Sequence, residues 1–295
     1  MPASILRDQG LSSLVAGDLE TLATGLIFTE GPLWLPSGDL LFQDMKADRT
    51  YRLSTRGKAE ILRENTGAAN GQTFDSSGRI VFCEQNGRRM SAMDRDGSNV
   101  TTITETFQGK RLNSPNDVVC RSDGRVYFTD PAYGVPSPEA KELPFQCVFM
   151  LEPGKNEPTL MIDDFEKPNG LAFSPDERTL YVCDTGKYHV RAFDVDSNGS
   201  VNPASSRVFA TMDPGAPGGP DGMKVDRSGR VYVAVALGIW VYEPDGQLLG
   251  IISTPKRPSN LAWCGNDAQE LAVTMIDMVC RVRMKVQGVV PPFRG

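Results

Sequence analysis

The stretch Ser114-Pro115-Asn116-Asp117-Val118-Val119 leads through the turn Ser122-Asp123-Gly124-Arg125 into Val126-Tyr127-Phe128-Thr129-Asp130. A polar residue opens a short apolar run, an Asp-Gly turn follows, and a second apolar run ends on an acid, which is typical of a β-hairpin. The same arrangement occurs six times in the chain, and an internal repeat of this kind decides the fold class. Each copy opens on a polar anchor residue, and the anchors are Glu30, Asn70, Asn116, Asn169, Asp221 and Asn260.

The copies share their spacing. Eight residues separate the anchor from the turn glycine in four of them: 30 to 38, 70 to 78, 116 to 124 and 221 to 229. Two more strand-like runs follow each of the first five hairpins, and in the first copy they are Arg49–Ser54 and Ala59–Arg63. Six units of four strands, at periods of about 39 to 53 residues, are typical of a propeller and not of a sandwich or a solenoid. We therefore predict an all-β fold, a six-bladed β-propeller of four-stranded blades.

The two ends of the chain differ from the repeats. The sixth unit lacks a fourth strand, because residues 286–295 are interrupted by glycine and prolines. A strand-like run, Leu19–Ala23, precedes the first anchor, and its pairing with the sixth unit would close the ring and remove two exposed strand edges. We predict one propeller domain over residues 1–295, with an N-terminal extension at 1–18 and a C-terminal tail at 286–295. Ile5–Leu14 is predicted as a short helix.

Composition and charge exclude several classes of partner. The 31 basic and 37 acidic residues give a net charge of -6, without the clustered basic face that nucleic acid requires. The N-terminus has no apolar segment typical of a signal peptide, and no apolar run approaches the roughly 20 residues of a membrane span. The six cysteines form no C-x-x-C pair, so we expect buried, reduced thiols. These features predict a cytoplasmic protein without a membrane or nucleic-acid partner, a monomer with a dimer as the alternative.

The anchors predict a cation site at one mouth of the central channel. In a propeller the first strand of each blade lines the channel, so the six anchors should gather at one end. Carboxylates crowded there would repel one another without a countercharge. Carboxylate and amide oxygens suit one hard divalent cation, Ca²⁺ first, with Zn²⁺, Mg²⁺ or Mn²⁺ as alternatives. The other reading is that Asn and Asp merely tolerate the backbone angles at strand starts. Further acids that end the second strands should lie at the same mouth: Asp44, Glu84, Asp130 and Asp184.

The motifs resemble the SMP-30/gluconolactonase/luciferin-regenerating-enzyme family. The similarity runs from Phe28-Thr29-Glu30-Gly31-Pro32 to about Thr274. Arg111–Asp117 and Tyr127–Gly134 look most like the bacterial gluconolactonase branch. The resemblance implies a six-bladed propeller with a metal-dependent lactonase activity. It also implies a set of metal ligands, which are Glu30, Asn116, Asn169 and Asp221.

The resemblance implies hydrolysis of a small-molecule lactone, with a sugar aldonolactone as the expected substrate. The metal would polarise the carbonyl group while water attacks it. Asp221 is predicted to be both ligand and catalytic base, with Asp184, Asp130 or a metal-bound hydroxide as alternatives. Squid-type diisopropylfluorophosphatase has a similar Glu-Asn-Asn-Asp set, so an organophosphate or other ester hydrolase is a second hypothesis. A non-enzymatic propeller that binds calcium or a protein partner is a third.

Four residues are predicted to bind the substrate. Arg111 and Asn113 lie just upstream of Asn116, where they could bond to substrate hydroxyl groups, although a solvated surface position is the alternative for Arg111. Asn70 is a further anchor amide at the same mouth. Tyr133 stands at the start of the longest connection on that side.

That connection, Pro131–Gln146, is predicted to cap the site, because long loops in compact domains are often binding loops. Ala216–Gly219 is the other candidate for the rim. His189 is the single histidine, which excludes a His dyad and a Ser-His-Asp triad. The tryptophans are expected in the core between blades, and they are Trp34, Trp240 and Trp263.

Overall fold

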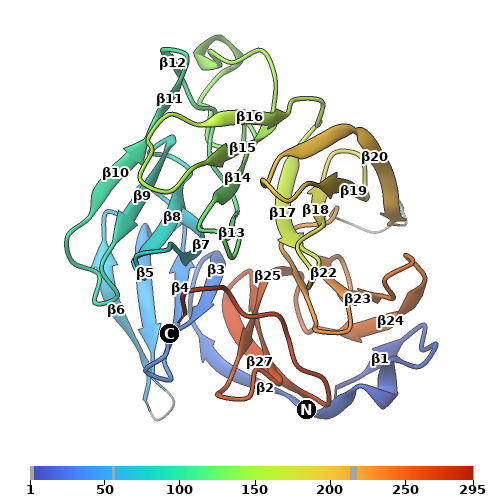
Figure 1. Ribbon diagram of the computed structural model, residues 1–295. Coiled ribbons are helices and arrows are strands. Elements are labelled where there is room, and N and C mark those ends of the chain that lie inside the picture. The colour runs from blue at the N-terminus through green and yellow to red at the C-terminus, as the bar shows by residue number, and fades with distance from the viewer. Residues whose placement is uncertain (1–2, 55–56, 213–217, 295) are drawn as a thin grey trace.

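The computed structural model describes residues 3–54, 57–212 and 218–294. Six antiparallel sheets stand around a central axis, as Figure 1 shows, and the first strand of each sheet lies innermost. Consecutive strands within a blade are neighbours, and most of them are joined by short turns. The predicted six-bladed β-propeller is confirmed.

The blades follow one another in chain order. Blades 1 and 2 consist of β3 (Thr29–Trp34), β4 (Leu40–Asp44), β5 (Arg49–Leu53) and β6 (Ala59–Glu64), then β7 (Ala69–Phe74), β8 (Ile80–Glu84), β9 (Arg89–Met93) and β10 (Thr101–Thr104). Blades 3 and 4 consist of β13 (Val118–Cys120), β14 (Val126–Asp130), β15 (Cys147–Leu151) and β16 (Thr159–Ile162), then β17 (Pro168–Phe173), β18 (Thr179–Asp184), β19 (His189–Val195) and β20 (Val201–Thr211). Blades 5 and 6 contain β21 (Met223–Val225), β22 (Val231–Val235), β23 (Gly238–Tyr242) and β24 (Leu248–Ser253), then β25 (Pro258–Cys264), β26 (Glu270–Met275) and β27 (Met278–Met284).

The ring closes as predicted. Strand β2 (Val15–Thr24) pairs antiparallel with β27 and supplies the fourth strand of blade 6. It is longer than the predicted Leu19–Ala23, because its pairing continues to Val15, which lies opposite Met284. Both ends of the chain therefore share one blade, and β27 is not left as an open edge.

The predicted helix at Ile5–Leu14 is wrong. Ile5–Leu6 form strand β1, which pairs with the outer edge of β24, and a single 3-10 turn, η1 (Leu11–Ser13), follows. Gly10 separates them with a φ of 117°, a conformation that no helix continues through. Backbone pairing to an open strand edge thus overrides a weak helical pattern.

One further element was not predicted. Strands β11 (Thr106–Phe107) and β12 (Lys110–Arg111) form a small hairpin after blade 2, at the top of Figure 1. The two helices in the described parts of the chain, η1 and η2 (Pro138–Ala140), are single turns, and no helix there is long and apolar enough to cross a membrane.

The core lies between neighbouring blades. Leu33 and Leu41 of blade 1, for example, pack against Phe74 and Phe82 of blade 2. The three tryptophans are between 2% and 8% exposed, as expected for core residues. The six cysteines are all free and buried, also as expected, and burial raises the pKa of their thiols.

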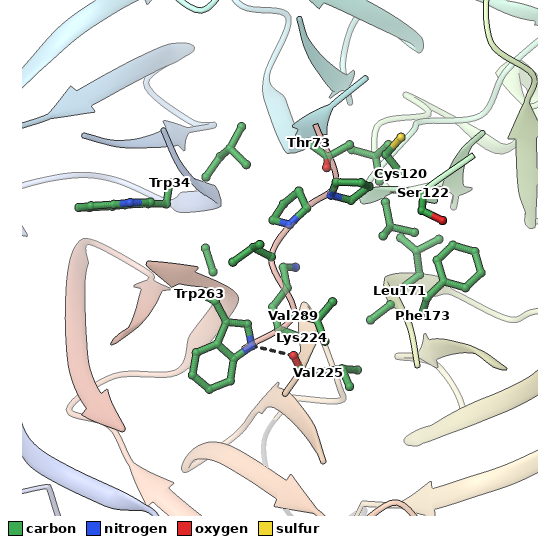
Figure 2. Close-up of a pocket in the computed structure, with 18 of the residues that line it drawn as sticks. Trp34, Thr73, Cys120, Ser122, Leu171, Phe173, Lys224, Val225, Trp263 and Val289 are labelled. Atoms are coloured by element: carbon green, nitrogen blue, oxygen red, sulfur yellow. Dashed lines mark hydrogen bonds between the residues drawn. The ribbon is translucent and has the colours of Figure 1, made fainter. Parts of the chain in front are cut away.

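As predicted, the C-terminal tail forms no strand over its described residues, 286–294. These residues follow a defined path across one end of the channel. Val289 donates its N–H to the carbonyl of Val225 at 3.0 Å, and Arg95 donates to the carbonyl of Phe293 at 3.1 Å. An apolar cavity of about 280 Å³ lies there. Figure 2 shows Val289 beside Lys224 and Val225 in this cavity. Because its walls come from the ends of the first strands that lie opposite the anchors, we call it the far pocket.

Candidate metal centre

The four predicted metal ligands line one pocket at the other end of the channel. This near pocket has a volume of about 700 Å³, and Asn70 and Tyr133 line it as well. Each ligand stands at or just before the first residues of an innermost strand, so the propeller repeat brings them together. They are between 3% and 7% exposed: Glu30, Asn116, Asn169 and Asp221.

The glycine that follows an anchor is required by close packing around the axis. A Cβ atom on Gly31 would lie 2.0 Å from the carbonyl oxygen of Asn70 in the next blade. A Cβ atom on Gly170 would lie 2.4 Å from the carbonyl oxygen of Asp221. The Glu-Gly and Asn-Gly pairs therefore reflect the approach of one blade to the next, and this approach also sets the anchors side by side.

Glu30 is a buried carboxyl group with few contacts that stabilise its ionised form. Burial, followed by the charges of Asp221 and Asp117, raises its pKa well above the usual value. Its Oε2 accepts one backbone hydrogen bond, from Gly31 at 3.0 Å. A carboxylate at this position needs a cation, because neither burial nor its charged neighbours favour the ionised form.

Asp221 lies in the same environment but has one cationic neighbour. Burial raises its pKa to about 6, and the guanidinium of Arg257 opposes this rise. The Nη2 of Arg257 lies 3.3 Å from Oδ2 of Asp221. Asp221 is therefore held by a side chain from the next blade, and a contact with the side chain of Asn169 also lowers its pKa.

The amide of Asn169 is oriented by Thr185. Thr185 Oγ1 donates its single hydrogen to the carbonyl of Pro220 at 2.6 Å, so it can only accept a bond from Asn169. The atom that faces it, 3.2 Å away, is therefore the Nδ2 of Asn169. This leaves the Oδ1 of Asn169 available as a ligand for a cation.

The amides of Asn116 and Asn70 also have free oxygens. In the described residues, no side-chain hydrogen bond involves Asn116, which is 6% exposed. The Oδ1 of Asn70 is buried without a hydrogen-bond partner. A buried, unpartnered oxygen is costly unless a ligand, ion or water satisfies it.

The sixth anchor, Asn260, is committed elsewhere. Its Nδ2 donates to Oδ2 of Asp117 at 3.3 Å, and its Oδ1 accepts the N–H of Leu261 at 2.8 Å. Lys224 lies 3.5 Å from the same Oδ1, and its charge lowers the pKa of Asp117, which burial raises. Asn260 is not among the residues that line the near pocket, although a contact with its side chain lowers the pKa of Glu30.

The acids at the ends of the second strands have hydrogen-bond partners within the protein. The two oxygens of Asp44 accept the backbone N–H groups of Ile27 and Phe28, each at 2.9 Å. Asp130 and Asp184 accept two backbone N–H groups in the same way. Glu84 instead accepts hydrogen bonds from Arg89 and Ser91. These carboxylates are satisfied without metal, and none of them lines the near pocket.

Two predicted substrate-binding residues lie away from the near pocket. Arg111 belongs to the outer hairpin, is exposed, and donates to the carbonyl of Gly87 at 3.1 Å. Asn113 is fully buried, and its Nδ2 donates to the carbonyls of Asp130 and Phe145. The side chain of Asn113 therefore joins its own segment to the two ends of the connection that follows β14. Neither Arg111 nor Asn113 is among the residues that line the pocket.

The connection Pro131–Gln146 is a fixed wall, not a free lid. Leu143 is 2% exposed, and Arg88 donates to the carbonyl of Ala140 at 3.1 Å. Tyr133, at its start, does line the near pocket. Burial raises the pKa of Tyr133 to about 12, while contacts with Thr185 and Asn169 lower it. The other rim candidate, Ala216–Gly219, lies partly outside the described residues.

Several pocket residues were not predicted. Thr185 and Arg257 contact the predicted ligands directly, and Thr185 could have been suspected because it follows the acid that ends β18. Arg257 lies three residues before the sixth anchor, Asn260, but its side chain contacts the fifth anchor, Asp221. A contact between two blades cannot be recognised from the sequence pattern of one repeat. Others also line the pocket, among them Lys46, Gln85 and Asn86.

The donor set differs from a site made of acids, histidines and thiolates. No group of three or more His, Cys, Asp or Glu side chains that could hold a metal occurs in residues 3–54, 57–212 and 218–294. The near pocket instead offers the carboxyl groups of Glu30, Asp48 and Asp221 together with amide oxygens. Such all-oxygen sets fit Ca²⁺ or Mg²⁺ better than Zn²⁺, which usually takes nitrogen or sulfur ligands.

Comparison with known proteins identifies the family to which the chain is similar. The sequence pattern described as "SMP-30/Gluconolactonase/LRE-like region" matches residues 28–277. A gluconolactonase of Zymomonas mobilis subsp. mobilis is 32% identical over 300 residues, with 93% of this chain and 83% of that protein covered. A pentonolactonase of Haloferax volcanii is 27% identical, with 83% and 80% covered. The solved structure of a gluconolactonase from Xanthomonas campestris superposes with a TM-score of 0.86 at 33% identity, covering 96% of this chain and 97% of that one. The chain belongs to the SMP-30/gluconolactonase/LRE-like family.

Proposed function

We propose that this protein is a metal-dependent lactonase that hydrolyses the ester bond of a lactone, with a sugar aldonolactone as the substrate class. The proposal rests on one arrangement: two buried carboxyl groups, Glu30 and Asp221, face one open pocket with the amides of Asn116 and Asn169. The relatives that are gluconolactonases and a pentonolactonase support the substrate class.

The four side chains are proposed to hold one divalent cation, Ca²⁺ by preference. Burial and the charge of Asp117 raise the cost of ionising both Glu30 and Asp221, and the charge of Asp221 adds to this cost at Glu30. A cation would offset that cost. The free Oδ1 of Asn169 and the unpaired side chain of Asn116 would complete the ligands. The bound cation would supply a Lewis acid that polarises the lactone carbonyl.

Asp221 is proposed to take the proton from the attacking water. Its carboxyl group lines the near pocket beside the other proposed ligands, where it could accept a proton from a water molecule in that pocket. Arg257 holds one of its oxygens, 3.3 Å away, and fixes its direction. In Asp130 and Asp184, the alternative bases, both carboxylate oxygens accept backbone hydrogen bonds, and this favours Asp221.

Asn70 and Tyr133 are proposed to contact the substrate. Both line the near pocket, and the Oδ1 of Asn70 has no partner in the protein. An acceptor of this kind suits a hydroxyl group of a sugar lactone. Because all these residues come from one chain, a monomer is sufficient for the activity.

Hydrolysis of a panel of aldonolactones, followed by proton release, tests the proposal. We expect turnover that is lost after chelation and restored by one divalent cation. Turnover that continues unchanged after complete chelation would contradict the metal dependence. Turnover of an organophosphate ester but of no lactone would contradict the substrate class.

A further inference from the structure

Three acids in the propeller make the same two hydrogen bonds at the same distance along the chain from an anchor. Asp44 accepts the N–H groups of Ile27 and Phe28, which stand three and two residues before Glu30, each at 2.9 Å. The acid always ends the second strand of the blade, next to the start of the first strand. We call Asp44, Asp130 and Asp184 the carboxylate clamps.

The other two clamps repeat this geometry. Asp130 accepts the N–H groups three and two residues before Asn116, at 2.8 Å and 2.6 Å. Asp184 accepts those three and two residues before Asn169, both at 2.9 Å. The three clamp acids are at most 1% exposed, so water does not compete for their oxygens.

The clamps occur only at three anchors that are proposed metal ligands. In blade 2 the acid that ends the second strand, Glu84, turns to Arg89 and Ser91. The N–H of Ala68, two residues before Asn70, is accepted instead by Asp48 of blade 1 at 2.8 Å.

Blades 5 and 6 lack the clamp because their residues lack the groups that form it. Their second strands end on Val235 and Met275, which have no carboxylate. In blade 6, two residues before Asn260, stands Pro258, which has no N–H to donate. The fourth proposed ligand, Asp221, is held by Arg257 instead.

Blade 2 also shows that the connection forms without a clamp. There the N–H of Gln85 bonds to the carbonyl of Ala68 at 3.2 Å. Blade 1 has the equivalent bond, from Met45 to Phe28 at 2.9 Å, and has the clamp in addition. The backbone turn is therefore common to both blades, and the clamp is an added constraint on the peptide units that lead to the ligand.

We propose that the carboxylate clamps are positioning residues for the metal ligands Glu30, Asn116 and Asn169. Two bonds to consecutive N–H groups fix both the place and the rotation of the segment that ends on each ligand. Metal sites need this precision, because their donor atoms must hold the productive geometry to within roughly 0.5 Å. The inference rests on the proposed function, since it takes these three anchors as ligands.

The test compares a clamp variant with a matched control. In Asp44→Asn one oxygen still accepts an N–H, but the new NH₂ group opposes the other N–H. Glu84→Gln changes an acid of similar burial, 2% exposed, at the same place in blade 2. Asp184→Asn repeats the test in a second clamp. For each protein we would measure the Kd of Ca²⁺ after chelation, the melting temperature without metal, and turnover against Ca²⁺ concentration.

We expect the clamp variants to bind Ca²⁺ roughly 10- to 100-fold more weakly than wild type, as loss of a supporting group around a metal does. Their melting temperature without metal should stay close to that of Glu84→Gln, and saturating Ca²⁺ should restore kcat. Clamp variants that bind Ca²⁺ as tightly as the control would overturn the inference. Clamp variants that fail to fold while the control folds would overturn it as well, because the acids would then serve the fold. Wild-type protein that binds no divalent cation would instead refute the proposed function.

Discussion

The two ends of the central channel are built from the same six strands but have opposite chemistry. The near pocket is open and contains carboxyl and amide groups from the starts of the innermost strands. The far pocket, shown in Figure 2, is mostly apolar, has a smaller volume and is crossed by the tail. Its labelled residues include Leu171, Phe173 and Trp263, whose Nε1 donates to the carbonyl of Val225 at 2.9 Å.

The difference shows that one repeated strand pattern places stabilising apolar contacts at one end of the channel and polar groups at the other. Each innermost strand starts on a polar anchor and continues as an apolar run, so polar groups collect at one end and apolar groups at the other. The apolar end is covered by residues 286–294, which replace water on the side chains around it. Among the described residues, no tail or other segment covers the polar end in this way, and unpartnered groups there, such as Asn70 Oδ1, are available to a ligand.

The largest effect should come from Asp221→Asn. The variant removes the proposed base and one of two ligand charges, so we expect kcat to fall by roughly 10²- to 10⁴-fold. Ca²⁺ affinity should fall less than turnover does. Ser122→Ala, which changes the far pocket, is the control and should keep the wild-type kcat. Steady-state kinetics at saturating Ca²⁺ measure both, and an active Asp221→Asn protein would exclude Asp221 as the base.

A smaller effect is a pH dependence of stability in the metal-free protein. Asp221 has a pKa of about 6 in the folded chain against an ordinary value of 3.8, and the pKa of Glu30 is raised well above its own. The folded state therefore binds these protons more tightly. The resulting stability is present below the unfolded pKa values and is lost as the pH rises through the folded ones.

The melting temperature in chelator should thus fall by several degrees between about pH 5 and pH 8. Glu30→Gln removes one of the two groups, so it should reduce this fall and should also weaken Ca²⁺ binding. Saturating Ca²⁺ should abolish the fall, because the bound cation favours the ionised groups. A melting temperature that rises with pH in chelator would show that folding does not raise the pKa values of Glu30 and Asp221.

The smallest effect on activity should come from the far end. Deletion of residues 286–295 would expose Trp263 and Val225, which the tail covers, so the melting temperature should fall. The value of kcat/KM for a lactone at low temperature should stay near wild type, because no residue of the tail lines the near pocket. A large loss of activity in a folded deletion variant would show that the two ends are coupled.

The fold, and the proximity of the proposed ligands, could be predicted from the sequence because of its internal repeat. The spacing from anchor to turn repeats, so each anchor must occupy the same place in its blade. This regularity brings Glu30 and Asp221 together although 191 residues separate them in the chain. The N-terminal strand could be predicted too, because the sixth unit was incomplete without it.

Features outside the repeat could not be predicted in the same way. Arg111 lies in an extra hairpin that turns its side chain toward Gly87, away from the pocket. The acids that end the second strands were expected only to lie at the same mouth. The partners of Asp44, Asp130 and Asp184 are backbone N–H groups, and a sequence does not reveal which backbone groups a side chain will contact. Arg257 reaches a ligand in the neighbouring blade, and such a contact depends on the distance between blades.

The position of the bound cation tests the central claim most directly. Crystals grown after chelation and soaked in Mn²⁺, which replaces Ca²⁺ and scatters anomalously, would locate it. We predict one strong anomalous peak in the near pocket, within ligand distance of Glu30, Asn116, Asn169 and Asp221. A peak elsewhere, or none in a protein that hydrolyses lactones, would contradict the proposed metal centre.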